Sequence, residues 1–471
     1  MASLLALYAV SLLTAASVGH GRYVQVVQQA ADEGTLAKTT TLPLAPGVAR
    51  PVYTFNDCLI LAMLVLPPRD NVFWHALSPR IPASDLNAPP LRTPPASLPQ
   101  FRQCGDLAVA LENPEIRSGY YHRYLHGDWV LAGALLAVLS FQSATMLLLV
   151  TVCGLLSALM LLSAYAIRQG PAASRPRDVA FLTLAGFLAL FYALPVYGRS
   201  LSFAPSDIVL IGFTLLAYRY PLSGLTERGF VTAVALFGTL TAIFEFLIGA
   251  IPAGLIVLLG LLALDRAPVA PRRVWLALAS YAGAIALALL TKTLVIAALS
   301  GWSEIAGSAG LMARHIAQTG WDMTADHAAR LEAFGFNVEA LKSNRALSAI
   351  YGLMKIGYFS SLVGLGSLAV GLVVTAVLPL VLVIWGAWRA LRTGDSSKRR
   401  RELLLLAAAA VMPVWYVVFT AHTIVHAFFM VRPMVWPAAV LLAGTVAFGV
   451  YRSSVANAPR SVCTEDMKLG G

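Results

Sequence analysis

Charged residues are scarce in this sequence: only 12% of its 471 residues are Asp, Glu, Lys or Arg, whereas 58% are hydrophobic. Such a composition excludes a soluble globular protein, because a soluble domain cannot bury that much apolar surface. The formal net charge is +11, but the basic residues stand in short runs between apolar segments. This pattern is typical of loops that orient membrane helices and argues against nucleic acid as a partner. The sequence therefore predicts a multi-pass membrane protein.

Cysteine is also rare, and the four cysteines include no close pair. This spacing excludes the usual zinc patterns and the Cys-x-x-Cys redox motif. The sequence also lacks an internal repeat of the kind that many transporters contain. The first apolar run, residues 2–18, has neither a basic start nor a convincing cleavage site, so we interpret it as a retained span, with a cleaved signal peptide as the alternative.

The apolar runs predict an all-α polytopic protein with about ten transmembrane helices, at about 20 residues per span. The expected spans are 2–19, 143–167, 178–196, 205–219, 229–247, 250–265, 274–298, 367–388, 403–420 and 433–451. Two long connections interrupt them, which divides the chain into a first helix (1–19), a first loop (20–142), a helical bundle (143–298), a second loop (299–366), C-terminal helices (367–451) and a tail (452–471).

The basic clusters beside these spans test the count. With alternating sides from a cytoplasmic start, all of them fall on the cytoplasmic side: Arg168, Arg175, Arg177, Arg219, Arg228, Arg266, Arg272, Arg273, Arg389, Arg392 and Lys398 to Arg401. That distribution is what the positive-inside rule requires. Both long loops and the connection at 419–433 are then expected to face outward.

The outward loops contain further elements. Residues 57–66 and 128–140 are apolar runs too short to cross a bilayer, and we expect them to be interfacial helices. Residues 67–99 are rich in Pro, Ser and Ala and predict an irregular segment. In the second loop, residues 303–318 have helical spacing and 322–345 form a charged patch.

Two carboxylates are candidate catalytic groups, because a charge at the edge of a span is costly and usually functional. Asp57, in "VYTFNDCLIL", stands where an apolar helix begins, at the mouth of an outward cavity. Its alternative role is a helix cap. Glu245, in "AIFEFLIGAIP", lies between two spans and is flanked by phenylalanines, which would raise its pKa. Its alternative is contact with interfacial water.

Several cations are candidate ligands for an anionic substrate. Lys292 lies about 18 residues into its span, too deep to reach water, so it requires an anionic partner. Arg199, in "YGRSLSFAPSD", and the stretch "YYHRYLHGDW" have the aromatic and basic residues of interface anchors. In that stretch, Arg123 and His126 are three residues apart and would share one face of a helix, which suits an anionic head group.

The stretch "FTAHTIVHAFFMVRP" adds His422 and His426, four residues apart, and Arg432. Two histidines on one helical face can supply two ligands of a metal site, but no third ligand is near in sequence. Hydrogen bonding of the histidines to phosphate or sugar hydroxyls, with the arginine as a fork of donors, accounts for the same residues without metal. Plain interfacial placement is the third alternative.

An outward cavity with a carboxylate at its mouth and cations deeper suits transfer from a lipid-linked phosphate. In plan, the chain resembles the GT-C superfamily of integral membrane glycosyltransferases: one N-terminal span, a long first loop with the early acidic residue Asp57, interfacial helices, then many spans. "VYTFNDCLIL", "YYHRYLHGDW", "FEFLIGAIP" and "WYVVFTAHTIVHAFFMVR" are similar to stretches of bacterial membrane proteins associated with that superfamily.

The resemblance implies transfer of a sugar, such as a pentofuranose like arabinofuranose, from a polyprenyl-phosphate donor to a glycan, lipid or protein acceptor at the outer face of the bacterial inner membrane. It maps the general base onto Asp57 alone. Many members carry a second adjacent acidic residue, and here Asn56 and Cys58 stand instead, so the base assignment and divalent metal use stay open. No cofactor is otherwise implied.

Three other functions compete with this one. An O-antigen ligase or polymerase would use basic residues of the second loop, where Arg314, His315, His327, Arg330 and Arg345 are available. A transporter or flippase of lipid-linked glycans would also contain buried charges, but such proteins more often have short loops. A purely structural subunit would leave Lys292 without a purpose.

One further expectation concerns the first loop. Cys58 and Cys104 both fall on the oxidising side of the expected topology, where disulfides form. A bond between them would hold the loop beside Asp57, although spacing alone does not establish the geometry that a disulfide needs.

Overall fold

The chain is a helical membrane protein whose apolar helices form a bundle. The computed structural model describes residues 9, 12–13, 18–36, 41–45, 48–51, 55–68, 72–82, 102–122, 124–245, 248–303, 305–306, 332, 337–344, 347–348, 350–352, 356, 371, 373–420, 424 and 427–456. Within them, five helices are long and apolar enough to cross a membrane: Phe141–Gln169, Pro271–Leu299, Val373–Arg392, Ser396–Val418 and Phe428–Tyr451. Helices satisfy their own backbone groups, which is the requirement for crossing a bilayer.

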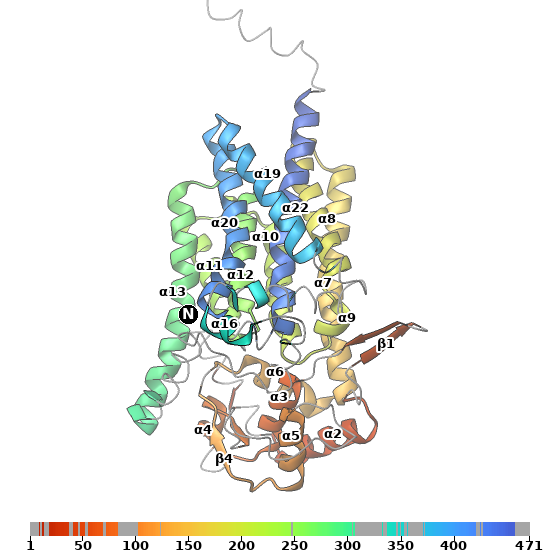
Figure 1. Ribbon diagram of the computed structural model, residues 1–471, viewed down its shortest axis with the longest axis vertical. Helices are drawn as coiled ribbons and strands as arrows, with labels where there is room; N and C mark the ends of the chain where they lie inside the picture. Colours follow the sequence, from red (N-terminus) through yellow and green to blue (C-terminus); the bar gives the residue numbers. More distant parts are fainter. Residues whose placement is uncertain are drawn as a thin grey trace, which may run out of the picture.

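Helices run side by side in the upper part of Figure 1. They are α7 Phe141–Gln169, α8 Arg175–Phe191, α10 Phe203–Arg219, α11 Glu227–Ile243, α12 Ala250–Ala263, α13 Pro271–Ser300, η2 Val373–Val377, α19 Leu378–Arg392, α20 Ser396–Val418 and α22 Ala427–Ala456. Each expected span after the first coincides with a helix of this bundle. The count of ten spans remains a prediction, because α8, α10, α11 and α12 are shorter than an independent span and most of 2–19 lies outside the described residues.

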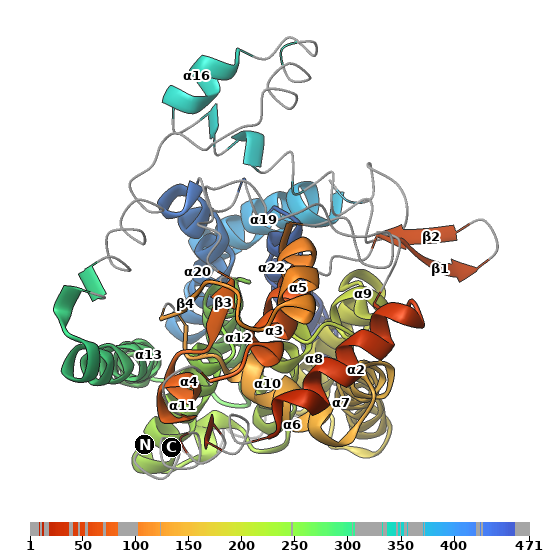
Figure 2. The same cartoon turned by 90° about the horizontal axis from the view of Figure 1, so that it is seen from below.

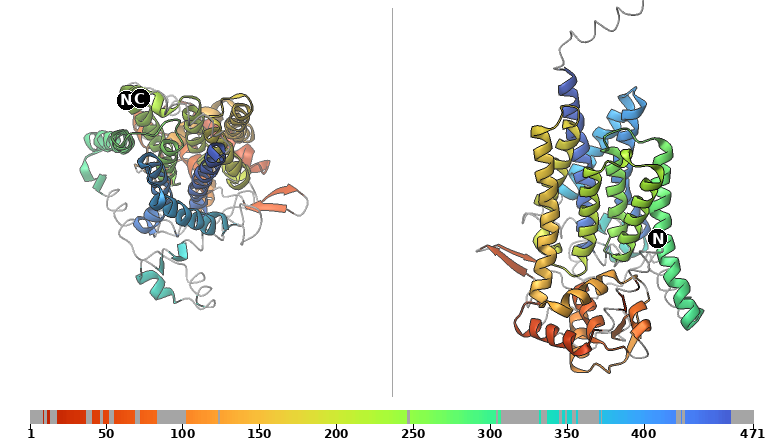
Figure 3. Two further views of the ribbon diagram at one scale, coloured as in Figure 1. Left: turned by 90° about the horizontal axis from the view of Figure 1, so that it is seen from above. Right: turned by 180° about the vertical axis from the view of Figure 1, so that it is seen from behind.

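The bundle places apolar side chains both inside and outside. In α12 every residue except Ile251 and Leu255 is buried, and this helix packs against α10, α11, α20 and α22. A helix that is apolar on all sides is stable only where neighbours surround it. The outer helix α7 instead exposes Val150 and Leu161, as a lipid-facing surface does. Seen end-on in Figure 3, the helices surround this centre.

The remaining described N-terminal elements form a layer across one end of the bundle, which we call the cap (Figures 1 and 3). The cap contains α2 His20–Asp32, α3 Phe55–Val65, α4 Val72–Leu77, α5 Arg102–Glu112 and α6 Gly127–Val138, with β3 Arg80–Pro82 paired antiparallel to β4 Ser118–Tyr120. A hairpin of β1 Thr41–Ala45 and β2 Val48–Pro51 projects sideways in Figure 2. Of the second long loop, the short helix α16 Val338–Ser343 is described, while most of 303–318 and of 322–345 lies outside the described residues.

The two apolar runs expected to be interfacial helices are α3 and α6. Helix α3 differs from that expectation, because residues 60–66 are all buried among α2, α5, α6 and β3. Its apolar residues cover every side of the helix, so it serves as the core of the cap and does not present a single apolar face. Helix α3 is therefore part of a packed layer, and the expected place of these helices at the outer membrane surface stays a prediction.

The cap rests directly on the bundle at Gly127, the first residue of α6. A Cβ atom added there would lie 2.4 Å from Cγ2 and 2.7 Å from the carbonyl oxygen of Ile243, which ends α11. Only glycine allows this approach, so the start of α6 is fixed against the end of a bundle helix.

A disulfide joins Cys58 in α3 to Cys104 in α5, with 5.0 Å between the Cα atoms. The predicted bond is thus confirmed, and it closes a loop of 46 residues. Because a cross-link restricts the unfolded chain, replacing both cysteines with serine is expected to lower the free energy of unfolding by about 2–5 kcal/mol. Denaturant unfolding of the purified protein measures this. Cys153→Ser, at the half-buried free cysteine of α7, is the control, and equal stability of both variants would contradict the prediction.

Candidate functional site

Four buried charged side chains from distant parts of the sequence meet where the cap contacts the bundle. Asp57 and Asp128 come from cap helices, whereas Glu245 and Arg432 come from the bundle. The charges of Asp57, Glu245 and Arg432 all shift the pKa of the Asp128 carboxyl. We call these four residues the seam cluster.

Asp57 lies in the first turn of α3, and its side chain reaches across to the start of α10. One carboxylate oxygen, Oδ1, accepts a hydrogen bond of 2.7 Å from Ser200 Oγ and one of 3.3 Å from the Ser202 amide. Burial raises the pKa of Asp57 to about 7, although these hydrogen bonds act in the opposite direction. Asp57 therefore exchanges a proton near neutral pH and also attaches the cap to the bundle.

Asp128, the second residue of α6, is only 1% exposed. Neither of its carboxylate oxygens has a hydrogen-bond partner in the part of the chain that the structure describes. Burial raises the pKa of Asp128 well above its usual range, the charges of Glu245 and Asp57 add to that rise, and Arg432 opposes it. Burial thus favours the protonated form of this side chain, in which it can donate a hydrogen bond.

Sequence reasoning missed Asp128 as a functional residue. Residues 128–140 predict an apolar helix by their length and composition, and the carboxylate that begins the run does not alter that prediction. The available signal was the similarity to Asp57, because both acids begin short apolar helices of the first loop.

Glu245 lies in the connection between α11 and α12. Its Oε1 accepts hydrogen bonds from the backbone amides of Ile248 at 2.7 Å and Gly249 at 3.3 Å. Its Oε2 accepts one from the amide of Ile251 at 2.7 Å. These amides belong to the start of α12, whose first N–H groups have no partner within the helix. Gly249 has φ +82°, a turn conformation that favours glycine. The carboxylate thus caps a helix and has both oxygens occupied.

Arg432 is the most enclosed member of the cluster, with no exposed surface. Its Nη1 donates to the Phe203 carbonyl at 3.0 Å, to Ser206 Oγ at 2.6 Å and to Asp207 Oδ1 at 2.8 Å. Nη2 donates to the Ile248 carbonyl at 3.1 Å. The sequence predicted a fork of donors for phosphate, whereas protein groups of α10 and of the turn before α12 occupy this fork.

Lys292 lies on α13 and is buried where that helix passes the cap. Its ammonium donates to the Tyr124 carbonyl, and no carboxylate of the described residues pairs with it. The sequence leaves two partners open for this buried ammonium, a protein carboxylate or a ligand phosphate, and within the described residues no carboxylate takes that place.

An apolar cavity of about 250 Å³ lies beside Lys292. Leu12 and Leu13, Leu125 and Ile243 contribute to its lining, with further apolar residues of α4 and α13. Ile243 is also the residue that touches Gly127, next to Asp128, so the cavity adjoins the seam cluster. A long apolar chain that ends in an anion matches this combination of an apolar wall and a buried ammonium.

His126 is buried directly before α6, with φ 59°. Its Nε2 lies 2.6 Å from the Tyr121 carbonyl, and this contact requires a proton on Nε2. Burial and the charge of Lys292 lower the pKa of His126 well below its usual value, so the ring is neutral. The described residues from 121 to 126 are not helical, so the face expected for His126 and Arg123 does not form, and Arg123 itself lies outside the described residues.

Arg199 is half-buried and directly precedes Ser200, the partner of Asp57. Its Nε has no partner among the described residues. His422 and His426 lie outside the described residues, so their expected roles stay predictions. Within the described part, no group of three or more His, Cys, Asp or Glu side chains is placed to hold a metal ion, which leaves divalent metal use untested.

The arrangement can perform acid–base chemistry beside an anion. Burial raises the pKa of both carboxyls, Asp57 and Asp128, which suits groups that take up or donate a proton near neutral pH. The apolar cavity beside Lys292 reaches the cluster through Ile243, which contacts Gly127. In comparisons with known proteins, no family model, curated protein or solved structure matches this chain.

Proposed function

We propose that the protein is a membrane glycosyltransferase of GT-C type, which transfers a sugar from a polyprenyl-phosphate donor to a glycan, lipid or protein acceptor. The observation that carries this proposal is the pair Asp57 and Asp128, two buried carboxyls that meet where the cap contacts the bundle, with the Asp128 oxygens unpartnered among the described residues. Acid–base transfer from a lipid-linked phosphate uses such groups.

Asp57 is the proposed general base. A base works best when its pKa lies near the operating pH, and the value of about 7 satisfies this condition. The acceptor hydroxyl gives its proton to the carboxylate while its oxygen bonds to the anomeric carbon. The bond from that carbon to the donor phosphate breaks, and polyprenyl phosphate leaves.

Asp128 is the proposed donor to the leaving phosphate. A protonated carboxyl without a partner among the described residues can hydrogen-bond an oxygen on which negative charge grows. Glu245 and Arg432 are positioning residues in this scheme, because protein groups already occupy them. Their expected direct roles, as a catalytic group and as a phosphate ligand, receive less support from the geometry.

Lys292 is the proposed ligand for the donor phosphate, with the polyprenyl chain in the adjoining cavity. Replacement by Met is expected to weaken donor binding about tenfold to hundredfold, since hydrogen bonds to charged groups contribute more than neutral ones. Equilibrium binding of radiolabelled polyprenyl-phosphate sugar measures the loss. Lys292→Arg keeps the charge and should recover part of the affinity. Unchanged binding by the Met variant would remove Lys292 from the site.

The proposed orientation places the cap outside the cytoplasm, at the outer face of a bacterial inner membrane. Two observations support it: the disulfide of the cap, and the position of the basic clusters at the other end of the bundle. Disulfides persist in oxidising compartments, and basic loops stay in the cytoplasm.

A direct assay tests the function. Purified protein is incubated with a panel of radiolabelled polyprenyl-phosphate monosaccharides, including pentofuranoses, and with cell-envelope acceptors. Movement of label to an acceptor, with release of polyprenyl phosphate, is the expected result. Transfer only from oligosaccharide diphosphates would favour the ligase alternative, whose candidates Arg314, His315, His327, Arg330 and Arg345 lie outside the described residues. Movement of intact donor across vesicles without transfer would favour a flippase.

A further inference from the structure

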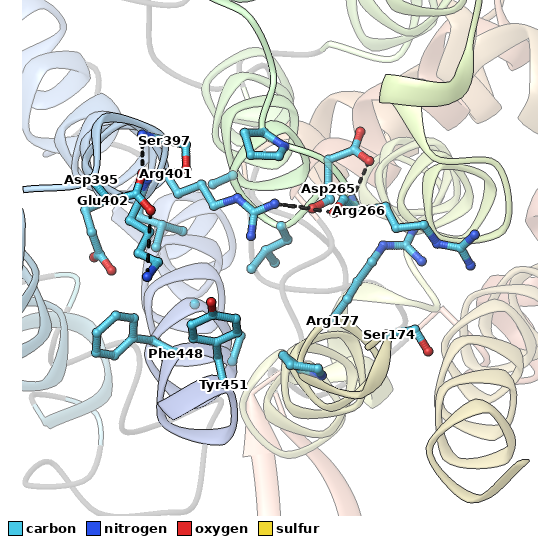
Figure 4. A pocket seen from close by; sticks show the side chains of 18 of the residues that line it. Ser174, Arg177, Asp265, Arg266, Asp395, Ser397, Arg401, Glu402, Phe448 and Tyr451 are labelled. Atoms are coloured by element: carbon cyan, nitrogen blue, oxygen red, sulfur yellow. Dashed lines mark hydrogen bonds and ion pairs between the residues drawn. The ribbon is translucent and has the colours of Figure 1, made fainter. Parts of the chain in front are cut away.

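A separate cavity, polar and of about 340 Å³, lies at the end of the bundle opposite the cap. Figure 4 shows it between the first turn of α8, the residues after α12, the start of α20 and the last turns of α22. It is more than twice the volume of an engineered cavity that admits benzene, about 150 Å³. The cavity is remote from the seam cluster, and the proposed transfer does not use it.

Among the described residues, two arginines on different sides of this cavity form no ion pair with a carboxylate. Arg177 is 8% exposed, and its Nη2 donates to the carbonyls of Ala217 at 3.1 Å and Tyr218 at 2.7 Å. Arg401 donates from Nη2 to the backbone carbonyl of Asp265 at 3.1 Å. In both arginines the Nε group is buried without a partner among the described residues. Buried N–H groups of a cation without partners indicate a missing acceptor.

The acidic side chains in the lining are already engaged. Glu402 pairs with Arg389 at 2.9 Å, and Asp395 lies 3.7 Å from Lys398. The Asp265 carboxylate accepts hydrogen bonds from the amide and the hydroxyl of Ser223 and from the amide of Arg266. The charge of Asp265 acts on both Arg177 and Arg401, and Glu402 is paired with Arg389. The lining then sets the cations Arg177, Arg266, Lys398 and Arg401 against Asp265 and Asp395, which leaves an excess of positive charge.

A neighbouring cavity of about 390 Å³ extends the site, because Ser174, Arg177 and Arg266 line both cavities. Arg266 is exposed at the boundary between the two. Phe448 and Tyr451 of α22 provide an aromatic wall on the far side. Basic pockets between helix ends, at the level of the lipid head groups, are suited to phosphate-bearing lipids.

We propose that this cavity binds a phosphate anion through Arg177, Arg266 and Arg401, either as the head group of an anionic phospholipid or as a soluble phosphate ester. Arginine recognises phosphate oxygens through paired N–H donors. The binding stabilises the folded protein, since a ligand bound only by the native state shifts the unfolding equilibrium.

Thermal unfolding in detergent tests the proposal, with phosphatidylglycerol, phosphatidylcholine or glycerol 3-phosphate as added probes. We expect phosphatidylglycerol to raise the unfolding midpoint in a saturable way, and phosphatidylcholine not to raise it. Arg266→Gln should increase the half-saturating concentration about fivefold. Because Arg266 is exposed, this variant is expected to fold. The double variant Arg177→Gln with Arg401→Gln should abolish the shift.

The matched control is Arg272→Gln, which removes an exposed arginine at the same end that pairs with Glu227 outside the cavity. It should respond to phosphatidylglycerol as the unmodified protein does. A shift by glycerol 3-phosphate alone would support the site and assign a soluble ligand. The proposal is overturned if neither anion raises the midpoint, or if Arg266→Gln and Arg272→Gln weaken the response equally, since general surface charge would then explain it.

Discussion

Replacing Asp57 with Asn is expected to reduce sugar transfer by about 10²- to 10⁴-fold while the protein stays folded. The amide has almost the same shape and can still accept the Ser200 hydrogen bond, but it cannot take a proton from the acceptor. Turnover of radiolabelled polyprenyl-phosphate sugar measures the effect, with donor binding measured in parallel and expected to persist. Asp32→Asn, at an exposed carboxylate of α2, is the control and should transfer normally.

The pH dependence of transfer provides an independent test of the same residue. The rate should rise with pH and level off above about 7, because only the ionised Asp57 accepts a proton. The free energy of unfolding should change in the opposite direction. The folded protein binds the Asp57 proton more tightly than the unfolded chain does, because burial raises the pKa of this carboxyl to about 7. The contribution of Asp57 to stability should therefore fall as the pH rises from about 4 to about 7. Asp57→Asn should therefore unfold no earlier than the unmodified protein at pH 8. Full turnover in this variant would remove the assignment of the base.

Replacing Arg432 with Met is expected to have the largest effect on stability, about 3–5 kcal/mol, because Asp207 would remain as a buried charge without its cation. The Tyr192 hydroxyl, which donates to the same carboxylate oxygen at 2.7 Å, compensates only in part. Denaturant unfolding of the purified protein measures the loss. The control is Arg432→Met combined with Asp207→Leu, which removes both charges and should recover much of the stability.

The same variants distinguish two roles for Arg432. If the arginine mainly connects α22 to α10, the single variant loses stability and the double variant regains it. If Arg432→Met unfolds normally but fails to bind donor, the phosphate role expected from the sequence would be correct and the structural role wrong.

The bundle could be predicted from the sequence because each helix is an apolar run with basic residues at one end. Alternation of those ends placed Arg168 and Arg272 at the same end of the bundle, and the structure agrees. The shorter helices show the limit of this reasoning. Composition cannot distinguish a lipid-facing helix from one like α12, which neighbouring helices surround.

The candidate site was predictable only in part. Asp57 and Lys292 stand out because each is an isolated charge in apolar surroundings, and both are buried where cap and bundle meet. The partners of Glu245 and Arg432 could not be predicted, since they depend on backbone amides and carbonyls whose positions the fold alone determines. Arg432 donates to its counterion, Asp207, which is 225 residues away in sequence.

If the protein has the proposed function and orientation, the bond between Cys58 and Cys104 adds a condition on when it becomes active. A thiol of a newly made chain stays reduced in the cytosol, so the helix that carries Asp57 is first secured after the loop has crossed the membrane and met an oxidant. Until then the nascent polypeptide has an incompletely anchored base. Export of the loop would thus be the maturation step. The protein would not transfer sugars from lipid carriers on the inner leaflet before that step.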